Sequence, residues 1–241
     1  NRKQCDETDY MTERYASPLV TVLSGEWDFL YFKRVSEMPA KIDSYKLRAD
    51  KVKVPSCWQF TGYENPYYVN IRYQFDCHPP RIPADEGFIG KNMPINAKGG
   101  PFKGYNSVGL YRKTFELKRK DKHILTFLGA ASNLQVYMNG QYVGYGEGSH
   151  NTSEFDVTPY VLDGMNEVIV LVYKWCNGTY LEAQDMFRNN GIFRDVYLTD
   201  YDDSYVWDFN WKAVCNEKDY RIYLHTDAVL AKGAELNASL Y

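Results

Sequence analysis

The sequence lacks long apolar runs, strongly clustered basic charge and a leading hydrophobic segment, and each absence excludes a class of protein. No apolar run approaches the ~20 residues that a membrane-spanning helix requires, so we expect no membrane partner. A formal net charge of −3 argues against a nucleic-acid partner, which needs clustered Lys and Arg. Because the first residues contain no hydrophobic signal segment, we expect a cytoplasmic protein.

Cysteine is scarce and widely spaced. The five residues form no C-x-x-C pair, and they are Cys5, Cys57, Cys77, Cys176 and Cys215. Zinc sites need close Cys and His pairs, and disulfide frameworks belong mainly to small secreted chains, so neither is predicted here. We interpret these residues as reduced thiols that are mostly buried.

Helical periodicity is also nearly absent, whereas apolar and polar residues alternate in many short segments. Trp27, Phe29 and Tyr31 share one face of an expected strand. Asn139-Gly140 lies between two alternating segments and predicts a hairpin turn, because both turn residues must accept positive φ. Residues 167–173 form a continuous apolar run, which predicts a strand that is buried on both faces or central in its sheet. Many short strands without intervening helices predict an all-β fold, a β-sandwich of the jelly-roll type.

Two connecting segments do not alternate. The basic run at residues 118–122 lies between two expected strands and is interpreted as a solvated hairpin turn. Residues 79–105 contain five prolines and several glycines, and we expect them to form a long surface loop.

The last forty residues predict the beginning of a second domain. An acidic connector at residues 199–204 is followed by two strand-like segments, 206–214 and 220–226. A seven-stranded immunoglobulin-like sandwich needs ~100 residues, so this portion is expected to be a truncated domain of that type. The predicted boundaries are therefore 1–200 for the jelly roll and 201–241 for the partial immunoglobulin-like domain.

The most informative segment is residues 178–196, which is polar, irregular and rich in charge until an expected strand at 192–198. Such a loop on a β-scaffold commonly displays a site. Asp185 is its candidate residue, because an ionised carboxylate forms strong hydrogen bonds to hydroxyl groups. The alternative interpretation of Asp185 is a surface carboxylate or a local cap of a tight turn.

Several irregular motifs in one order resemble the amino-terminal sugar-binding jelly roll of family 2 glycoside hydrolases of the β-galactosidase type. The motifs are Ser24-Gly-Glu-Trp-Asp-Phe29, Val54-Pro-Ser-Cys-Trp-Gln59 with Gly62-Tyr-Glu-Asn-Pro66, Val108-Gly-Leu-Tyr-Arg-Lys-Thr-Phe115, Asn139-Gly-Gln-Tyr-Val-Gly144, Ser153-Glu-Phe-Asp156 and Gln184-Asp-Met186. The resemblance covers residues 19–198. Two positions depart from it, since Phe187 replaces a usual Trp and Asn190 replaces a usual Ser.

The resemblance implies the amino-terminal, substrate-binding part of a retaining β-galactosidase that hydrolyses terminal β-galactosides. The partners would be the galactoside and the protein's own carboxy-terminal barrel, which would lie beyond Tyr241 and carry both the catalytic glutamates and a Mg²⁺ ion. This chain by itself is expected to be inactive, with no catalytic residue of its own. The alternatives are a non-catalytic carbohydrate-binding module and a family 2 β-glucuronidase or β-mannosidase. Homo-oligomerisation is possible.

The resemblance also assigns roles in the site. Asp185 would bind a sugar hydroxyl and ligate a monovalent cation such as Na⁺, and Asn139 would contact the sugar with its amide. Arg188 and Arg194, with Glu182 and Asp195 nearby, are interpreted as an ion-pair network that holds the loop. Two further aromatic candidates for sugar stacking, Trp58 and Trp175, are expected to be buried core residues.

Overall fold

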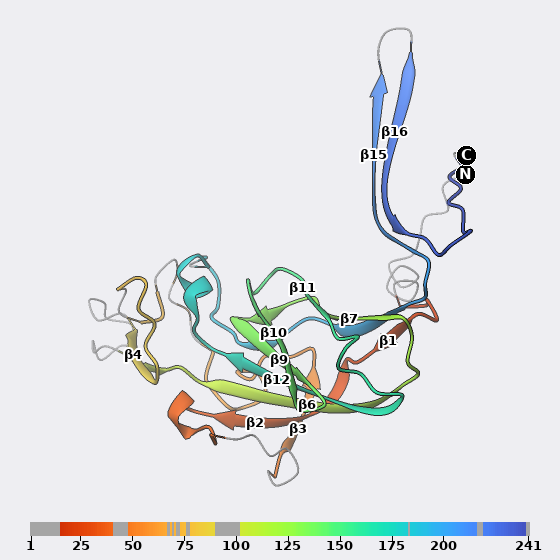
Figure 1. Cartoon of the computed structure of the whole chain (residues 1–241). Coiled ribbons are helices and arrows are strands. Elements are labelled where there is room, and N and C mark those ends of the chain that lie inside the picture. The colour runs from red at the N-terminus through yellow and green to blue at the C-terminus, as the bar shows by residue number, and fades with distance from the viewer. Residues whose placement is uncertain are drawn as a thin grey trace.

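Two antiparallel β-sheets face each other and enclose the hydrophobic core of the chain (Figure 1). The computed structural model describes residues 15–40, 48–66, 68, 70, 73–75, 78–89, 102–182, 184–215 and 219–239. Within these ranges the regular structure is strand, apart from two short 3₁₀ turns, η1 (Val35–Glu37) and η2 (Asn177–Tyr180). No helix of this described part is long and apolar enough to cross a membrane. The all-β prediction is confirmed.

The larger sheet has six strands. In spatial order they are β10 (Gln141–Glu147), β9 (Asn133–Met138), β12 (Gly164–Tyr173), β6 (Val108–Leu117), β2 (Gly25–Phe32) and β3 (Asp50–Val54). The smaller sheet has four, in the order β1 (Val20–Val22), β14 (Val196–Tyr201), β7 (Lys122–Phe127) and β11 (Ser153–Asp156). Two short ladders complete the sandwich, β8 (Ala130–Ala131) with β13 (Gly191–Ile192), and β4 (Glu86–Ile89) with β5 (Phe102–Tyr105).

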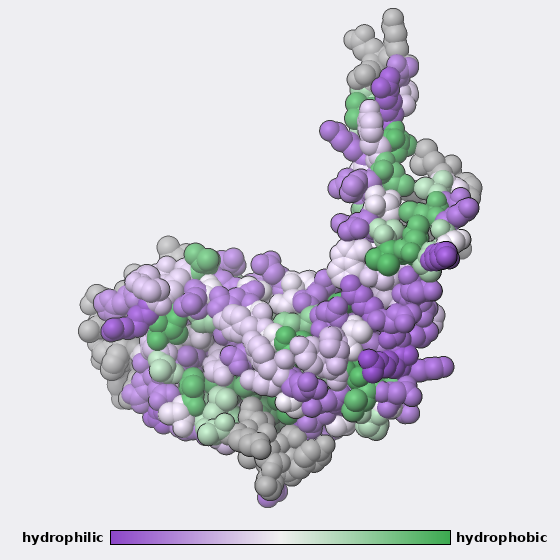
Figure 2. All heavy atoms as spheres, in the orientation of Figure 1, coloured by the Kyte–Doolittle hydropathy of each residue, from purple (hydrophilic) through white to green (hydrophobic). Residues whose placement is uncertain are grey.

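A long hairpin follows the sandwich and projects away from it (Figure 1). It consists of β15 (Tyr205–Cys215) and β16 (Tyr220–Val229), so both predicted strands of this portion are present. Cross-strand partners share a face of a hairpin, and one face here is apolar. That face includes Phe209, Trp211, Ala213, Ile222 and Leu224. Figure 2 shows hydrophobic residues along this projecting arm.

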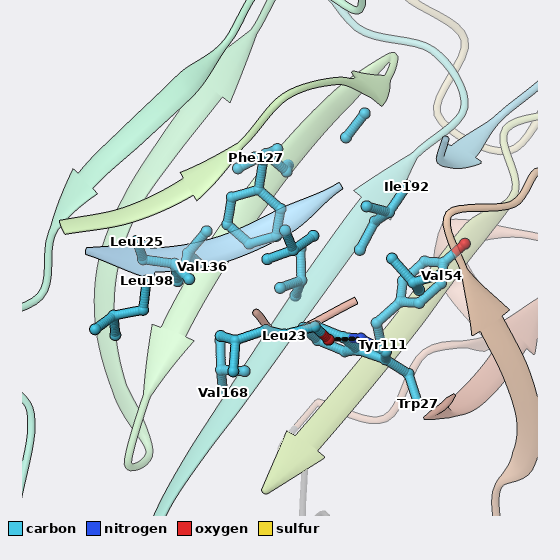
Figure 3. Packing of buried hydrophobic residues seen from close by; sticks show 14 of the residues in the cluster. Leu23, Trp27, Val54, Tyr111, Leu125, Phe127, Val136, Val168, Ile192 and Leu198 are labelled. Atoms are coloured by element: carbon cyan, nitrogen blue, oxygen red, sulfur yellow. Dashed lines mark hydrogen bonds between the residues drawn. The ribbon is translucent and has the colours of Figure 1, made fainter. Parts of the chain in front are cut away.

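The main core lies between the two sheets and uses the inward positions that the alternation predicts. Leu125 and Leu198 of the smaller sheet meet Val136 and Val168 of the larger one in a single cluster (Figure 3). Trp27 is 1% exposed, and its indole Nε1 donates to the Leu23 carbonyl at 2.8 Å, which satisfies the one polar group of this large side chain.

A second apolar cluster covers the outer face of the six-stranded sheet. Its buried members are Val108, Leu110, Ile169 and Leu171, and the η1 segment packs over them through Val35. β12 contributes to both clusters and pairs with β9 and β6 on its two sides. The prediction of a central strand at residues 167–173, buried on both faces, is confirmed.

Two local predictions were wrong, and a third was wrong at the two ends of its segment. The basic run at 118–122 joins β6 to β7, which belong to different sheets, so it is a crossover and not a hairpin turn. The strand expected at 192–198 is broken after β13, and β14 resumes on another partner. The ends of the 79–105 segment pair as β4 and β5, while residues 90–101 lie outside the described residues. Alternation reveals that a strand exists, but its partner depends on contacts that are remote in sequence.

Candidate functional site

Asp185 lies in an exposed loop, residues 182–190, between η2 and β13. One carboxylate oxygen, Oδ1, accepts a hydrogen bond from the Tyr68 hydroxyl. The Tyr68 ring lies 5.8 Å from the ring of Phe187 between centroids, and the two backbones form an isolated β-bridge. The hydrogen bond to Asp185 raises the pKa of Tyr68 above its ordinary value. The carboxylate is therefore oriented by a neighbouring segment and still open to solvent.

Arg188 anchors the loop through a buried side chain that bonds to two backbone carbonyls. Its side chain is buried, with 6% of the residue exposed. Nη1 donates to the Glu182 carbonyl at 3.1 Å, and Nη2 donates to the Asn70 carbonyl at 2.6 Å. Asn70 has a φ of 54°, in the left-handed region where Asn is tolerated better than most residues. One guanidinium thus joins the two ends of the loop to the segment that carries Tyr68.

The predicted ion-pair network around the loop takes a different form. Both carboxylate oxygens of Glu182 accept from Ser149, from its N–H and its Oγ, each at 2.6 Å. Asp195 accepts from the hydroxyls of Tyr15 and Ser24. Arg194 donates to backbone carbonyls, and within the described ranges no ion pair joins it to Glu182 or Asp195. Among the described residues, the loop is held mainly through backbone and hydroxyl groups.

A cavity of about 160 Å³ lies beneath the loop. Its walls include Ser132, Ser149, Glu182, Arg188 and Phe193. Asn189 also lines it, and its buried Oδ1 has no hydrogen-bond partner among the described residues. The cavity therefore has both polar and apolar walls. It could hold a hydroxyl group or a water molecule that donates a hydrogen bond to Asn189 Oδ1.

Asn139 occupies the β9–β10 turn, with a φ of 51°. Its Nδ2 donates to the Tyr160 carbonyl and to Asn166 Oδ1, both at 2.8 Å, and its Oδ1 accepts from the Glu167 N–H at 2.9 Å. The hairpin prediction is confirmed. The predicted sugar contact is untested by this geometry, although both amide protons are already engaged by Tyr160 and Asn166, which lie outside the turn.

A cation at Asp185 would need ligands from outside the described residues. Across the described part, no group of three or more His, Cys, Asp or Glu side chains is arranged to hold a metal ion. Asp185 offers a hard carboxylate ligand that suits a monovalent cation, but it supplies only part of a coordination shell. The donor chemistry fits such an ion, provided that further oxygen ligands come from outside these residues.

The sequence prediction omitted several residues that the structure places near Asp185. Tyr68 and Asn70 lie just beyond the Gly62–Pro66 motif, so extending that motif by four residues would have included both. Trp58 and Trp175 are 1% and 2% exposed, which confirms that they are core residues and not sugar platforms.

Comparison with known proteins identifies relatives of this domain. The family described as glycosyl hydrolases family 2, sugar binding domain, matches residues 20–201. A β-galactosidase of Actinobacillus pleuropneumoniae is 40% identical over 207 residues, covering 86% of this chain and 18% of that protein. A β-galactosidase of Staphylococcus xylosus is 37% identical over 200 residues, covering 81% of this chain and 18% of that protein. This chain therefore spans less than a fifth of the length of these curated relatives.

Solved structures show the same fold at low sequence identity. A β-glucuronidase from Ruminococcus gnavus, in complex with uronic deoxynojirimycin, aligns with a TM-score of 0.59 and 16% identity, over 87% of this chain and 34% of that one. A family 2 β-galacturonidase from Eisenbergiella tayi bound to galacturonate aligns with a TM-score of 0.54 and 14% identity, over 86% of this chain and 29% of that one. These matches support the fold only.

Proposed function

The chain belongs to the sugar-binding domain of the glycosyl hydrolases of family 2, and on this premise we propose that it is the amino-terminal part of a β-galactosidase. In that enzyme Asp185 would bind a hydroxyl of the galactoside. The observation that carries this role is the exposed carboxylate held by Tyr68 on an anchored loop.

The role of this domain is to position the substrate. A retaining glycosidase needs two carboxyl groups ~5–5.5 Å apart across the scissile bond, and a barrel domain would supply that pair. Asp185 would fix the orientation of the sugar beside them, which stabilises the transition state by pre-arranged hydrogen bonding. We therefore expect the 241-residue chain alone to bind galactose too weakly to detect and to hydrolyse nothing.

Asp185 is also the proposed ligand for a monovalent cation such as Na⁺. The ion would neutralise part of the carboxylate charge and help to order the sugar hydroxyls, with its other oxygen ligands coming from the barrel. The proposed Mg²⁺ site lies on the barrel as well, outside this chain. A cytoplasmic location and an immunoglobulin-like domain that begins at residue 201 complete this proposal.

The test is Asp185→Asn in the complete protein, assayed with aryl β-galactosides. Loss of a hydrogen bond to a charged group costs roughly 1.5–3 kcal/mol, so kcat/KM should fall about 10- to 150-fold. Asp202→Asn is the matched control, because Asp202 lies outside the loop and pairs with Lys120. The activity of the Asp185 variant should also lose its response to added Na⁺. A wild-type kcat/KM in Asp185→Asn would contradict the assignment.

The same assay separates the competing substrates. Aryl β-glucuronides and β-mannosides are tested beside the galactoside with the wild-type complete protein. A higher kcat/KM for either would move the function to that glycoside while leaving the family unchanged. Sugar binding without turnover of any of them would favour a non-catalytic binding module.

A further inference from the structure

Gln59 is a buried amide at the base of the Asp185 loop, with 4% of the residue exposed. It meets Asn190 through two hydrogen bonds. Its Oε1 accepts from the Asn190 N–H at 2.8 Å, and its Nε2 donates to Asn190 Oδ1 at 3.1 Å. The neighbouring Trp58 N–H donates to the Asn190 carbonyl at 2.9 Å. Asn190, the last residue of the loop, is therefore held at its N–H, its carbonyl and its side chain.

A buried ion pair determines which way the Gln59 amide points. Glu64 Oε2 accepts from Gln59 Nε2 at 3.1 Å and from the Lys174 ammonium at 2.7 Å. An ionised carboxylate has no proton to donate, so it can only face the NH₂ end of the amide. The carbonyl end of Gln59 is then left to face the Asn190 N–H.

The opposite orientation of the amide is unfavourable at both ends. A flipped Gln59 would place its carbonyl oxygen against the Glu64 carboxylate and its NH₂ group against the Asn190 N–H. Both contacts would bring like partial charges together in a buried site, where water cannot compensate them. Glu64 is itself fixed, because its other oxygen, Oε1, accepts from Tyr31 and Ser107.

We propose that Gln59 is a positioning residue, oriented by the Glu64–Lys174 pair, that holds Asn190 and so fixes the loop that presents Asp185. The effect on catalysis rests on the proposed function, whereas the effect on the loop does not. The chain of contacts runs from Lys174 through Glu64 and Gln59 to Asn190, five residues after Asp185.

The first test measures the position of the Asp185 loop without any enzyme assay. The Tyr68 hydroxyl is titrated by NMR in the 241-residue chain carrying isotope-labelled tyrosine, because its bond to Asp185 raises the Tyr68 pKa. In Gln59→Leu this pKa should fall toward the ordinary value of about 10. Thr126→Val is the control, since it removes a different buried polar group, the hydroxyl of Thr126 on β7, and should leave the Tyr68 titration unchanged.

A second variant keeps the proposal testable if Gln59→Leu fails to fold. Asn190→Ala removes the Oδ1 acceptor and the long Nδ2 hydrogen bond to the Lys174 carbonyl but retains the backbone bonds, so the Tyr68 pKa should fall partway. A wild-type Tyr68 titration in a folded Gln59→Leu, or in Asn190→Ala if that first variant does not fold, would overturn the inference.

The second test measures the activity of the complete protein. Gln59→Leu should lower kcat/KM for an aryl galactoside by at least tenfold, and Thr126→Val should not. An absence of galactoside turnover in the wild-type protein would count against the proposed function, and the Tyr68 titration would still decide the role of Gln59. If Gln59→Leu retained full kcat/KM while the wild type was active, Gln59 would not position the site.

Discussion

The ammonium of Lys174 lies 2.7 Å from Oε2 of Glu64, and their side chains are 4% and 14% exposed. The two residues are 110 positions apart in the sequence. Burial lowers the pKa of Lys174, whose charged form is favoured by Glu64. Burial alone would raise the pKa of Glu64, but Lys174, Ser107 and Tyr31 outweigh it and hold that pKa below its ordinary value. Each charge is tolerated inside the domain because the other is present.

Replacing one member of this pair should be strongly destabilising. Lys174→Met leaves the Glu64 carboxylate buried without its counter-ion, which costs about 3–5 kcal/mol. Urea unfolding followed by tryptophan fluorescence measures the loss. The double variant Lys174→Met with Glu64→Gln removes both charges and should recover part of the stability. A single variant within ~0.5 kcal/mol of wild type, the usual range for surface substitutions, would contradict this account.

The same pair predicts a pH dependence of stability. The lowered pKa of Glu64 means that the unfolded state binds its proton more readily than the folded state. The stabilisation is therefore complete above the ordinary glutamate pKa of about 4.3 and is lost as the pH falls below it. The difference in unfolding free energy between wild type and Glu64→Gln should shrink as the pH falls from 6, over a range on the order of a few pH units. Thr126→Val, which removes a buried hydroxyl and no ionisable group, should show no such trend.

Gly191 has two reasons to be glycine. Its φ is +128°, and an added Cβ would lie 2.8 Å from the Ser56 carbonyl oxygen and 2.9 Å from the Tyr111 hydroxyl oxygen. Gly191→Ala should cost about 2–5 kcal/mol, from backbone strain and overpacking together. Gly164→Ala is the control, because its φ is +95° with no atom within 4 Å, and it should cost only about 1–2 kcal/mol. Thermal unfolding of both variants compares them, and equal losses would rule out the steric contribution.

The apolar face of the β15–β16 hairpin should promote self-association of the 241-residue chain. Trp211 is 62% exposed and pairs with Leu224, which is 50% exposed. Large exposed apolar patches commonly mark interaction surfaces. Trp211→Lys should shift the chain toward monomer in sedimentation-velocity experiments. Asn210→Lys adds the same charge on the opposite face and should leave the association unchanged, so an equal effect of both would point to net charge instead.

Much of the sandwich could be predicted from residue alternation. The strand around Trp27 and Phe29, the Asn139-Gly140 turn and the doubly buried β12 were all expected, because side-chain period and turn chemistry are local properties. The crossover at 118–122 and the break after β13 were not expected. Both depend on which sheet receives the next strand, which local sequence does not specify.

The candidate site was predictable in part. Asp185 was identified from its loop and from the family motif, and the structure shows it exposed and oriented. Its donor Tyr68 was missed, and Gln59 stood in a quoted motif without a role, since these residues are 117 and 126 positions away and have no periodic signature. The Arg and Asp residues of the loop suggested ion pairs, but the actual partners are mainly carbonyls and hydroxyls that only folding brings near.

The sequence by itself determined that this protein is an all-β domain with a polar loop around Asp185, because alternation, turn residues and motif order are encoded along the chain. The tertiary structure decided how that loop is held. Tyr68, Gln59 and the Glu64–Lys174 pair reach it from other segments, and hydrogen bonds require groups within about 3 Å whatever their separation in sequence.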